Sequence, residues 1–316
     1  MKTFLKVFFI ASLCFGLMFA SGIYAFNKYQ VDDQEDIKVE VIEDNVVNIE
    51  ETEKKDKKSK LEKLIKESNR INVLAFGVEG YRADTIMLVS YDPDNDLLDI
   101  VSIPRDTYHK VKSFNASGQY KINAIYGFNQ NGGSKGMKAY LENFLNVPID
   151  AYVKVDYDGV ESIIDVIGGI NVYISQKMDY DDPYSDPPLH IHFEKGNHHL
   201  NGKDALKYLR WRKNNDGKNL GDINRISRQQ DFLKKAIDKA LGLKLPKVVK
   251  TSLNYVQTDM KAGKIINLAY KAKDFQMKNL KTYQIPGEVD TVNNLSFYIH
   301  HPGEMEKMFE EIYSRK

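Results

Sequence analysis

Two different hydrophobic patterns divide the chain. Residues Phe4 to Phe26 are apolar apart from Lys6 and a few small polar residues. The run is about as long as the ~20 residues that cross a bilayer as a helix. Lys2 and Lys6 precede its apolar centre, which predicts a cytoplasmic N-terminus. We therefore predict a single-pass anchor within residues 1–28, with the rest of the chain outside the cell; the alternative is a signal peptide cleaved near Ala20-Ser-Gly22.

Residues 29–68 have no strong core pattern. The segment begins with several acidic residues and becomes lysine-rich over residues 54–60. Such sequence buries too little apolar surface to fold alone, so we interpret it as a solvated stalk. The valines at 39, 41, 46 and 47 leave a short strand as an alternative, and residues Leu61 to Ser68 predict a short helix.

From Ile71 onward, apolar stretches of strand length alternate with stretches of helical periodicity. Strands are predicted over Ile71–Val78, Thr85–Tyr91, Leu97–Ile103, Ala151–Val155, Asn171–Ile174, Leu280–Ile285 and Ser296–Ile299. Helices are predicted over Ser134–Leu145, Tyr157–Ile167, Asn201–Leu209, Arg225–Leu241 and Lys264–Phe275, and from Pro302. The turn residues Asp92 to Asp96 predict a hairpin. The interleaved pattern predicts one α/β domain over residues 69–316, with a mixed central sheet covered by helices.

Composition excludes several classes of protein. The chain has 316 residues, and its 45 basic and 44 acidic residues leave a net charge of only +1. This balance argues against a nucleic-acid binder that works through bulk electrostatics. A single cysteine, Cys14, rules out an intramolecular disulfide and a cysteine-based metal site.

Arginines gather in one part of the sequence. Four arginines and two glutamines occur between residues 206 and 230: Arg210, Arg212, Arg225, Arg228, Gln229 and Gln230. A guanidinium stays charged and presents a rigid fork of donors that fits phosphate oxygens. The cluster therefore predicts a site for a multiply charged anion such as a pyrophosphate. Arg210 and Arg212 would share one face of an extended segment.

The helix that follows carries further candidates. Asp222, Arg225 and Gln229 fall at i, i+3 and i+7, near one face of its first two turns. Free N–H groups and the helix dipole attract anions at this end. Arg228 faces elsewhere and is interpreted as structural, and a charged outer helix face is the alternative for the whole set.

Charged residues also follow the predicted strands. The turn from Glu79 to Asp84 offers carboxylates, the ligands that Mg²⁺ prefers, although an ordinary polar turn is the alternative. Arg105 and Asp106 follow a buried strand, where α/β folds commonly bind ligands, and a surface ion pair is the alternative. Four histidines could suggest a metal site, but they flank a predicted strand and turn, so we interpret them as solvated: His190, His192, His198 and His199.

Taken together, these motifs resemble the LytR-CpsA-Psr family of Gram-positive cell-wall enzymes, from about Ile71 to Leu241. The resemblance is carried by Arg82-Ala-Asp84-Thr85, Ser102-Ile-Pro-Arg105-Asp106-Thr107, Lys121-Ile-Asn-Ala, Val166-Ile-Gly168-Gly169, Leu200-Asn-Gly202, Ala205-Leu206, Arg210-Trp-Arg212, Asp222, Arg225 and Arg228-Gln229-Gln230. The family usually has Asp where Glu79 stands, and a longer loop before Arg82.

The resemblance implies a fold, an activity and a set of site residues. It implies an α-β-α layered extracellular domain that binds polyprenyl-pyrophosphate-linked glycans at the membrane and transfers the glycan phosphate to peptidoglycan. Asp84 and Glu79 would hold Mg²⁺. The pyrophosphate would be bound by Arg105, Arg210, Arg212 and Arg225, assisted by Lys121 and Gln229. Arg105, Arg210, Arg212 and Asp222 are the expected catalytic residues, and Asp222 would orient the arginines or help to activate the acceptor.

The physical demands of phosphoryl transfer agree with these residues, because the reaction needs mainly positioning and charge stabilisation. Two other functions stay open at this point. One is a pyrophosphatase that uses water on the same lipid-linked substrate. The other is a non-catalytic lipid- or glycan-binding module that regulates envelope assembly. The sequence does not identify the glycan.

Overall fold

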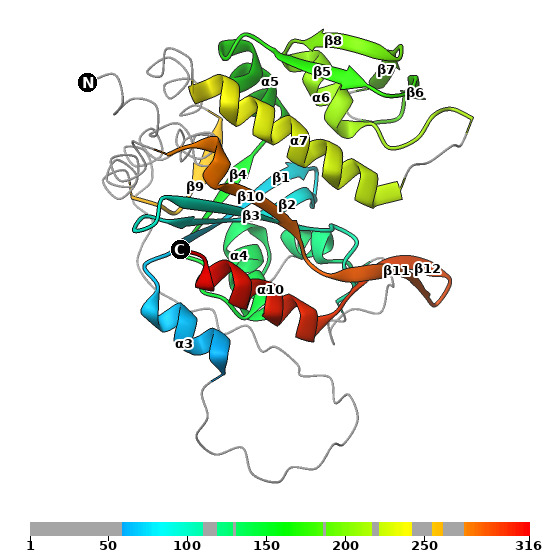
Figure 1. Cartoon of the computed structure of the whole chain (residues 1–316). Helices are drawn as coiled ribbons and strands as arrows, with labels where there is room; N and C mark the ends of the chain where they lie inside the picture. The colour runs from blue at the N-terminus through cyan, green and yellow to red at the C-terminus, as the bar shows by residue number, and fades with distance from the viewer. Residues whose placement is uncertain are drawn as a thin grey trace, which may run out of the picture. The chain divides into compact units, whose positions relative to one another are not determined.

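The computed structural model describes residues 59–109, 119–128, 131–185, 188–216, 221–241, 255–261 and 275–316. Their alternating helices and strands (Figure 1) and their mixed central sheet confirm the predicted α/β class. The predicted anchor, the stalk valines and residues 264–274 of a predicted helix lie outside these ranges. Within the ranges, no helix has both the length and the apolarity that crossing a membrane requires. The α-β-α layering and the N-terminal membrane helix stay predictions.

The elements follow one another as the periodicity predicts, with several additions. The strands are β1 (Ile71–Glu79), β2 (Arg82–Asp92), β3 (Leu97–Ile103), β4 (Ala151–Val155), β5 (Ile170–Ile174), β6 (Met178–Asp182), β7 (Leu189–Phe193), β8 (Gly196–Leu200), β9 (Val256–Thr258), β10 (Leu280–Gln284), β11 (Gly287–Val292) and β12 (Leu295–His300). The helices are α3 (Lys60–Glu67), η3 (Ile122–Gly127), α4 (Gly133–Leu145), α5 (Tyr157–Val166), α6 (Gly202–Arg210), α7 (Gly221–Leu241), η4 (Met277–Asn279) and α10 (Pro302–Ser314).

Six strands form the central sheet in the order β10-β3-β2-β1-β4-β9. β10 runs parallel to β3, whereas β2 with β3 and β4 with β9 are antiparallel, so the sheet is mixed. All seven residues of β3 are buried. Burial along the whole length of a strand is typical of a strand that is covered on both faces.

The chain clusters into two compact units. The first contains Ala75–Glu79 and the described residues of Val153–Lys278. The second contains residues 59–74, Gly80–Tyr152 and Asn279–Lys316.

Ionic contacts hold the core of the second unit. Arg70 Nη1 donates hydrogen bonds to Asp99 Oδ2 at 2.8 Å and to Ser90 Oγ at 3.3 Å, and Arg70 Nη2 lies 4.0 Å from Asp92 Oδ2. Arg315 Nη1, just beyond α10, contacts the other oxygen of Asp99. We call Arg70, Asp92, Asp99 and Arg315 the buried ion cluster. It fixes the C-terminal end of the chain to β3.

The turn between β1 and β2 packs closely against η3 within the second unit. Gly80 has a φ of 58°, which favours glycine. A Cβ added at Gly127 would lie 2.5 Å from the carbonyl oxygen of Tyr81 and 2.9 Å from its Cβ. Gly127 is therefore required for this approach, and Tyr81 itself is 82% exposed.

In the first unit, side chains cap two of the helices. Asp156 accepts from the N–H of Gly159 at the start of α5, and Asn201 caps α6 by accepting from the N–H of Asp204. Two glycines with positive φ, Gly168 and Gly169, end α5 as predicted. Short antiparallel pairs that the periodicity does not predict, β5 with β8 and β6 with β7, complete the unit.

Candidate active site

Four charged side chains gather at the end of β3. Arg105 Nη1 contacts Asp84 Oδ1, and Arg105 Nε lies 4.0 Å from Asp106 Oδ1. Lys121 Nζ lies 3.1 Å from the same oxygen of Asp106. We call Asp84, Arg105, Asp106 and Lys121 the Arg105 group. The structure thus brings together three of the predicted site residues: Asp84, Arg105 and Lys121.

The β2–β3 hairpin explains why Asp84 meets Arg105. Ile86 pairs with Ile103 in the antiparallel register, and continuing the register by two residues brings position 84 opposite position 105. The turn after β3 is closed by Thr107, whose Oγ1 donates to Pro104 O at 2.6 Å. The main chain of η3 then fixes the turn, because Asn123 N donates to Arg105 O at 3.1 Å.

Lys121 is positioned by aromatic rings and a backbone bridge. Tyr108 forms an isolated antiparallel bridge with Lys121. The ammonium of Lys121 lies 5.4 Å from the centre of the Phe297 ring, and Tyr108 packs edge-on against the same ring at 5.1 Å. The lysine is therefore held beside Asp106, where it adds a second cation to the group.

Of the two predicted metal ligands, Asp84 lies in a strand rather than in the predicted turn. Asp84 lies inside β2, which begins at Arg82 rather than at the predicted Thr85, so it belongs to a strand and not to the turn. The apolar pattern missed this because Arg82 and Asp84 flank the single buried Ala83. Glu79 ends β1, and its side chain lies outside the described part of the structure.

The Arg105 group is neither fully buried nor freely solvated. The side chains of Arg105 and Asp84 are 17% and 18% exposed. In this setting a charge interacts more strongly than in bulk water, yet a ligand can still reach it. Two cations and two carboxylates can therefore bind an anion, a hard cation or both.

The segment Arg210-Trp211-Arg212, here called the arginine segment, follows α6 in the first unit. Arg210 is the last residue of α6, and its guanidinium lies 4.6 Å from the centre of the Tyr157 ring. Helix α6 therefore continues one residue beyond the predicted Leu209, and Arg210 is not part of an extended segment with Arg212. That the two arginines share one face stays a prediction. Trp211 is almost fully buried and anchors the segment.

Helix α7 contacts the arginine segment through Arg228. The helix begins at Gly221, four residues before the predicted start at Arg225. Asp222 and Arg225 lie in its first two turns, as predicted. Their side chains lie outside the described part of the structure. Arg228 Nη2 donates to Trp211 O, and the guanidinium lies 5.1 Å from the Trp211 ring. Burial lowers the pKa of Arg228 to about 10. These contacts agree with the structural role predicted for Arg228.

Gln229 lies beside the end of α6. Its Nε2 donates to Leu209 O at 3.5 Å, a long contact. The predicted role of Gln229 in binding pyrophosphate stays a prediction. So does the convergence of the Arg105 group and the arginine segment on one ligand.

Asn214 and Tyr157 position the arginine segment, and sequence analysis missed both. Asn214 Oδ1 accepts from Trp211 Nε1 at 3.1 Å and from the N–H of Asp179 at 2.9 Å. No signal marks Tyr157 as the ring under Arg210, because it belongs to a different helix far away in the sequence. The sequence marks Asp106 only as a neighbour of Arg105. In the structure its carboxylate also contacts Lys121.

Comparison with known proteins identifies the family. The sequence model described as the LytR_cpsA_psr family matches residues 38–314 of the chain. The chain belongs to the LytR-CpsA-Psr family. The predicted family resemblance is therefore confirmed, and the match extends beyond the range of the motifs.

This LytR-CpsA-Psr protein is similar to two relatives from Bacillus subtilis (strain 168), both described as polyisoprenyl-teichoic acid–peptidoglycan teichoic acid transferases. TagV is 33% identical over 228 residues, which are 68% of this chain and 56% of TagV. The chain thus spans little more than half the length of that relative. TagU is 32% identical over 243 residues, which are 74% of each protein.

A crystal structure of Bacillus subtilis TagV has a similar fold. It aligns with a TM-score of 0.63 and 29% sequence identity, and the alignment covers 78% of this chain and 98% of that chain. The likeness confirms the mixed α/β architecture as that of the LytR-CpsA-Psr family.

Proposed function

We propose that this protein transfers a glycopolymer phosphate from a polyprenyl-pyrophosphate carrier to peptidoglycan and releases polyprenyl phosphate. Its family membership and its teichoic acid transferase relatives support the proposal. The structural observation that carries it is the part-exposed Arg105–Asp84 pair, with Lys121 beside it, at the end of a fully buried strand. Arginine and lysine donors on so rigid a support suit the binding of a diphosphate.

In the proposed reaction, an acceptor hydroxyl oxygen forms a bond to the glycan-side phosphorus. The bond from that phosphorus to the bridging oxygen breaks, and polyprenyl phosphate leaves with the electron pair. The hydroxyl proton passes to solvent or to Asp222. Guanidinium groups stabilise the charge that builds on the phosphate oxygens. Arg105, Arg210, Arg212 and Arg225 are proposed for this role, with Lys121 and Gln229 assisting.

Mg²⁺ is the proposed cofactor. The part-exposed carboxylate of Asp84 fits its preference for oxygen ligands, and Glu79 is the proposed second ligand. When bound, the ion would neutralise charge on the diphosphate. Because Asp84 pairs with Arg105 in the structure, the guanidinium of Arg105 would become available to the phosphate oxygens when Asp84 holds the ion.

The apolar run from Phe4 to Phe26 is the proposed membrane anchor. An anchor places the domain outside the cell, next to a lipid carrier that cannot leave the bilayer. This arrangement would keep the polyprenyl chain in the membrane while the diphosphate is bound.

A transfer assay tests the proposal. Purified full-length protein is incubated with a lipid-linked glycan and peptidoglycan, with and without Mg²⁺, and the products are separated. We expect glycan covalently attached to peptidoglycan. The Arg212→Ala variant should lose about 10²–10³-fold in rate, as when one donor to a developing oxyanion is removed. Lys207→Ala is the matched control, because Lys207 lies on α6 and pairs with Asp204 at 3.6 Å.

The other outcomes separate the competing functions. Free glycan phosphate without attachment would identify a pyrophosphatase. Retained binding of the lipid-linked glycan without turnover would identify a non-catalytic module. An Arg212→Ala variant as active as the Lys207→Ala control would contradict the role of the arginine segment.

A further inference from the structure

The β6–β7 hairpin places two aspartates directly opposite two histidines. In its antiparallel register Asp179 pairs with His192, and Asp181 pairs with His190. Alternate residues of a strand point to opposite faces. The inner face is apolar and buried through Met178, Leu189 and Ile191, so the two aspartates and two histidines share the outer face.

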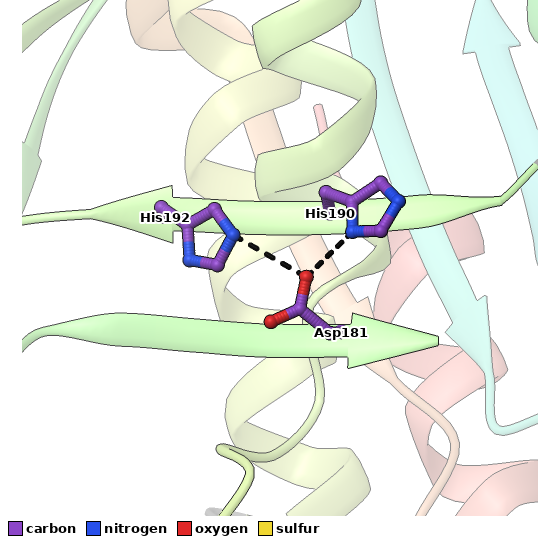
Figure 2. A group of neighbouring side chains, drawn as sticks. All are labelled: Asp181, His190 and His192. Atoms are coloured by element: carbon purple, nitrogen blue, oxygen red, sulfur yellow. Dashed lines mark hydrogen bonds and ion pairs between the residues drawn. The ribbon is translucent and has the colours of Figure 1, made fainter. Parts of the chain in front are cut away.

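The contacts within this group are short. His190 Nδ1 lies 2.6 Å from Asp181 Oδ1, and His192 Nε2 lies 3.3 Å from the same oxygen. Figure 2 shows both imidazoles, from β7, turned toward the carboxylate of Asp181 on β6. The ligand atoms of the three residues all lie within 4.8 Å of one another.

Asp179 orients the second histidine. His192 Nδ1 lies 2.7 Å from Asp179 Oδ1, so this carboxylate favours the neutral tautomer that carries its proton on Nδ1. The lone pair of Nε2 then faces the carboxylate oxygen of Asp181. Two electron-rich atoms at 3.3 Å attract only when a proton or a metal cation lies between them. A carboxylate behind a histidine that faces a cation is also the usual arrangement of metal-binding histidines.

We propose that Asp181, His190 and His192 bind a divalent transition-metal ion of the Zn²⁺ class, with Asp179 as the carboxylate that orients His192. Two imidazoles and a carboxylate suit Zn²⁺, whereas Mg²⁺ prefers oxygen ligands alone. This site is separate in sequence and in chemistry from the Asp84 carboxylate proposed for Mg²⁺.

One of the ligand pairs already has the separation that a tetrahedral site requires. Ligands about 2.1 Å from a tetrahedral zinc ion are about 3.4 Å apart. The His192 Nε2–Asp181 Oδ1 distance of 3.3 Å already matches this value. The 2.6 Å between His190 and Asp181 must lengthen as the metal replaces the shared proton. Metal and protons therefore compete for the site, because a histidine ligand must be neutral.

Hydrogen bonds connect the proposed metal site to the arginine segment. Asn215 N donates to Asp179 O at 2.9 Å, and Asp181 N donates to Asn215 Oδ1 at 3.0 Å. Asn214 joins the backbone of β6 to the indole of Trp211. A metal that clamps β6 to β7 would therefore stiffen the support of Arg210 and Arg212.

The neighbouring histidines provide a matched control. His198 Nε2 lies 2.7 Å from the carbonyl of Glu194, and His199 Nδ1 lies 2.7 Å from Asn171 Oδ1. Neither His198 nor His199 belongs to the cluster of Asp181, His190 and His192. The four histidines that the sequence groups together thus form two different pairs.

Metal titration tests the site. Full-length protein purified without a polyhistidine tag and stripped of metal is titrated with Zn²⁺ by calorimetry and with Co²⁺ by visible absorption. We expect one saturable site with histidine-to-cobalt character that excess Mg²⁺ does not displace. H190A/H192A should abolish binding, Asp179→Asn should weaken it by about 10–100-fold, and H198A/H199A should leave it unchanged.

Two results would overturn the inference: no Zn²⁺ binding by the wild-type chain, or equal binding by wild type and H190A/H192A. Circular dichroism and the metal-free melting temperature establish that each variant is folded. H190Q/H192Q, which keeps polar side chains on the outer face, repeats the test if the alanine variant unfolds.

Discussion

The buried ion cluster and the Arg105 group use the same two residue types on adjacent strands for different purposes. In each, an arginine pairs with an aspartate of the β2–β3 hairpin: Arg70 with Asp99, and Arg105 with Asp84. The side chains of Arg70 and Asp99 are 1% and 0% exposed. Those of Arg105 and Asp84 are 17% and 18% exposed.

This difference in exposure determines what each pair can do. A charge removed from water must be matched within the protein, so breaking a buried pair leaves a costly partner behind. Near the surface, water screens the pair and competes for it. Under the proposed function, Arg105 can therefore exchange Asp84 for a phosphate, and Asp84 can exchange Arg105 for a metal ion, whereas the buried pair of Arg70 and Asp99 cannot be opened in this way. Residue type alone does not separate structural from functional ion pairs.

The largest expected effect is on stability, at Arg70. Arg70→Ala leaves Asp92 and Asp99 in the core with Arg315 as the remaining guanidinium of the cluster. We expect the free energy of unfolding to fall by about 3–5 kcal/mol, measured by urea denaturation. Lys60→Ala is the control, because its pair with Glu310 is exposed and contributes about 1 kcal/mol at most. Equal losses for both variants would contradict the argument that a buried ion pair matters more for stability than a solvated one.

The next effect is on catalysis, at Arg105. Arg105→Ala should reduce transfer to peptidoglycan by about 10²–10³-fold, or about 2.7–4 kcal/mol of transition-state stabilisation. The free energy of unfolding should change by only about 1 kcal/mol. Arg105→Lys should recover part of the activity, because lysine keeps the charge but not the fork of donors. If a variant at Arg105 loses stability and activity together, the Arg105–Asp84 pair is structural, like the buried ion cluster.

The smallest effect is a pH dependence near the buried ion cluster. Burial, followed by the charge of Asp99, raises the pKa of Tyr283 from 10.0 to about 12. Because the phenol ionises first in the unfolded chain, its contribution to stability is complete below pH 10 and is lost as the pH rises to about 12. Tyr283→Phe should therefore flatten the fall of the urea midpoint above pH 10. Parallel curves for the two proteins would mean that folding does not raise the pKa of Tyr283.

Much of the fold could be predicted from the sequence because burial leaves a pattern. The strand over Leu97–Ile103 and the helix capped by Asn201 are both found where predicted, since apolar runs and capping residues act locally. The hairpin of β6 and β7 could not be predicted in the same way. Met178-Asp-Tyr-Asp-Asp182 contains three aspartates, which strands rarely use, and only its partner β7 makes it a strand.

The candidate site was predicted in its parts but not in its contacts. Asp84 and Arg105 were each identified, yet their pairing follows from the hairpin register rather than from either motif. The contact of Arg210 with Tyr157 depends on the packing of two helices, and no periodicity contains it. The buried ion cluster was missed altogether, because a charged residue within an apolar strand does not indicate which distant partner neutralises it.

The close approach of Gly127 to the main chain of Tyr81 limits how this turn can change in length. Residues inserted between Gly80 and Tyr81 find η3 on one side and water on the other, so a longer loop can extend only outward. The exposed ring of Tyr81 marks that open direction. An epitope or fluorophore introduced there would remain accessible without disturbing the strand that carries Asp84.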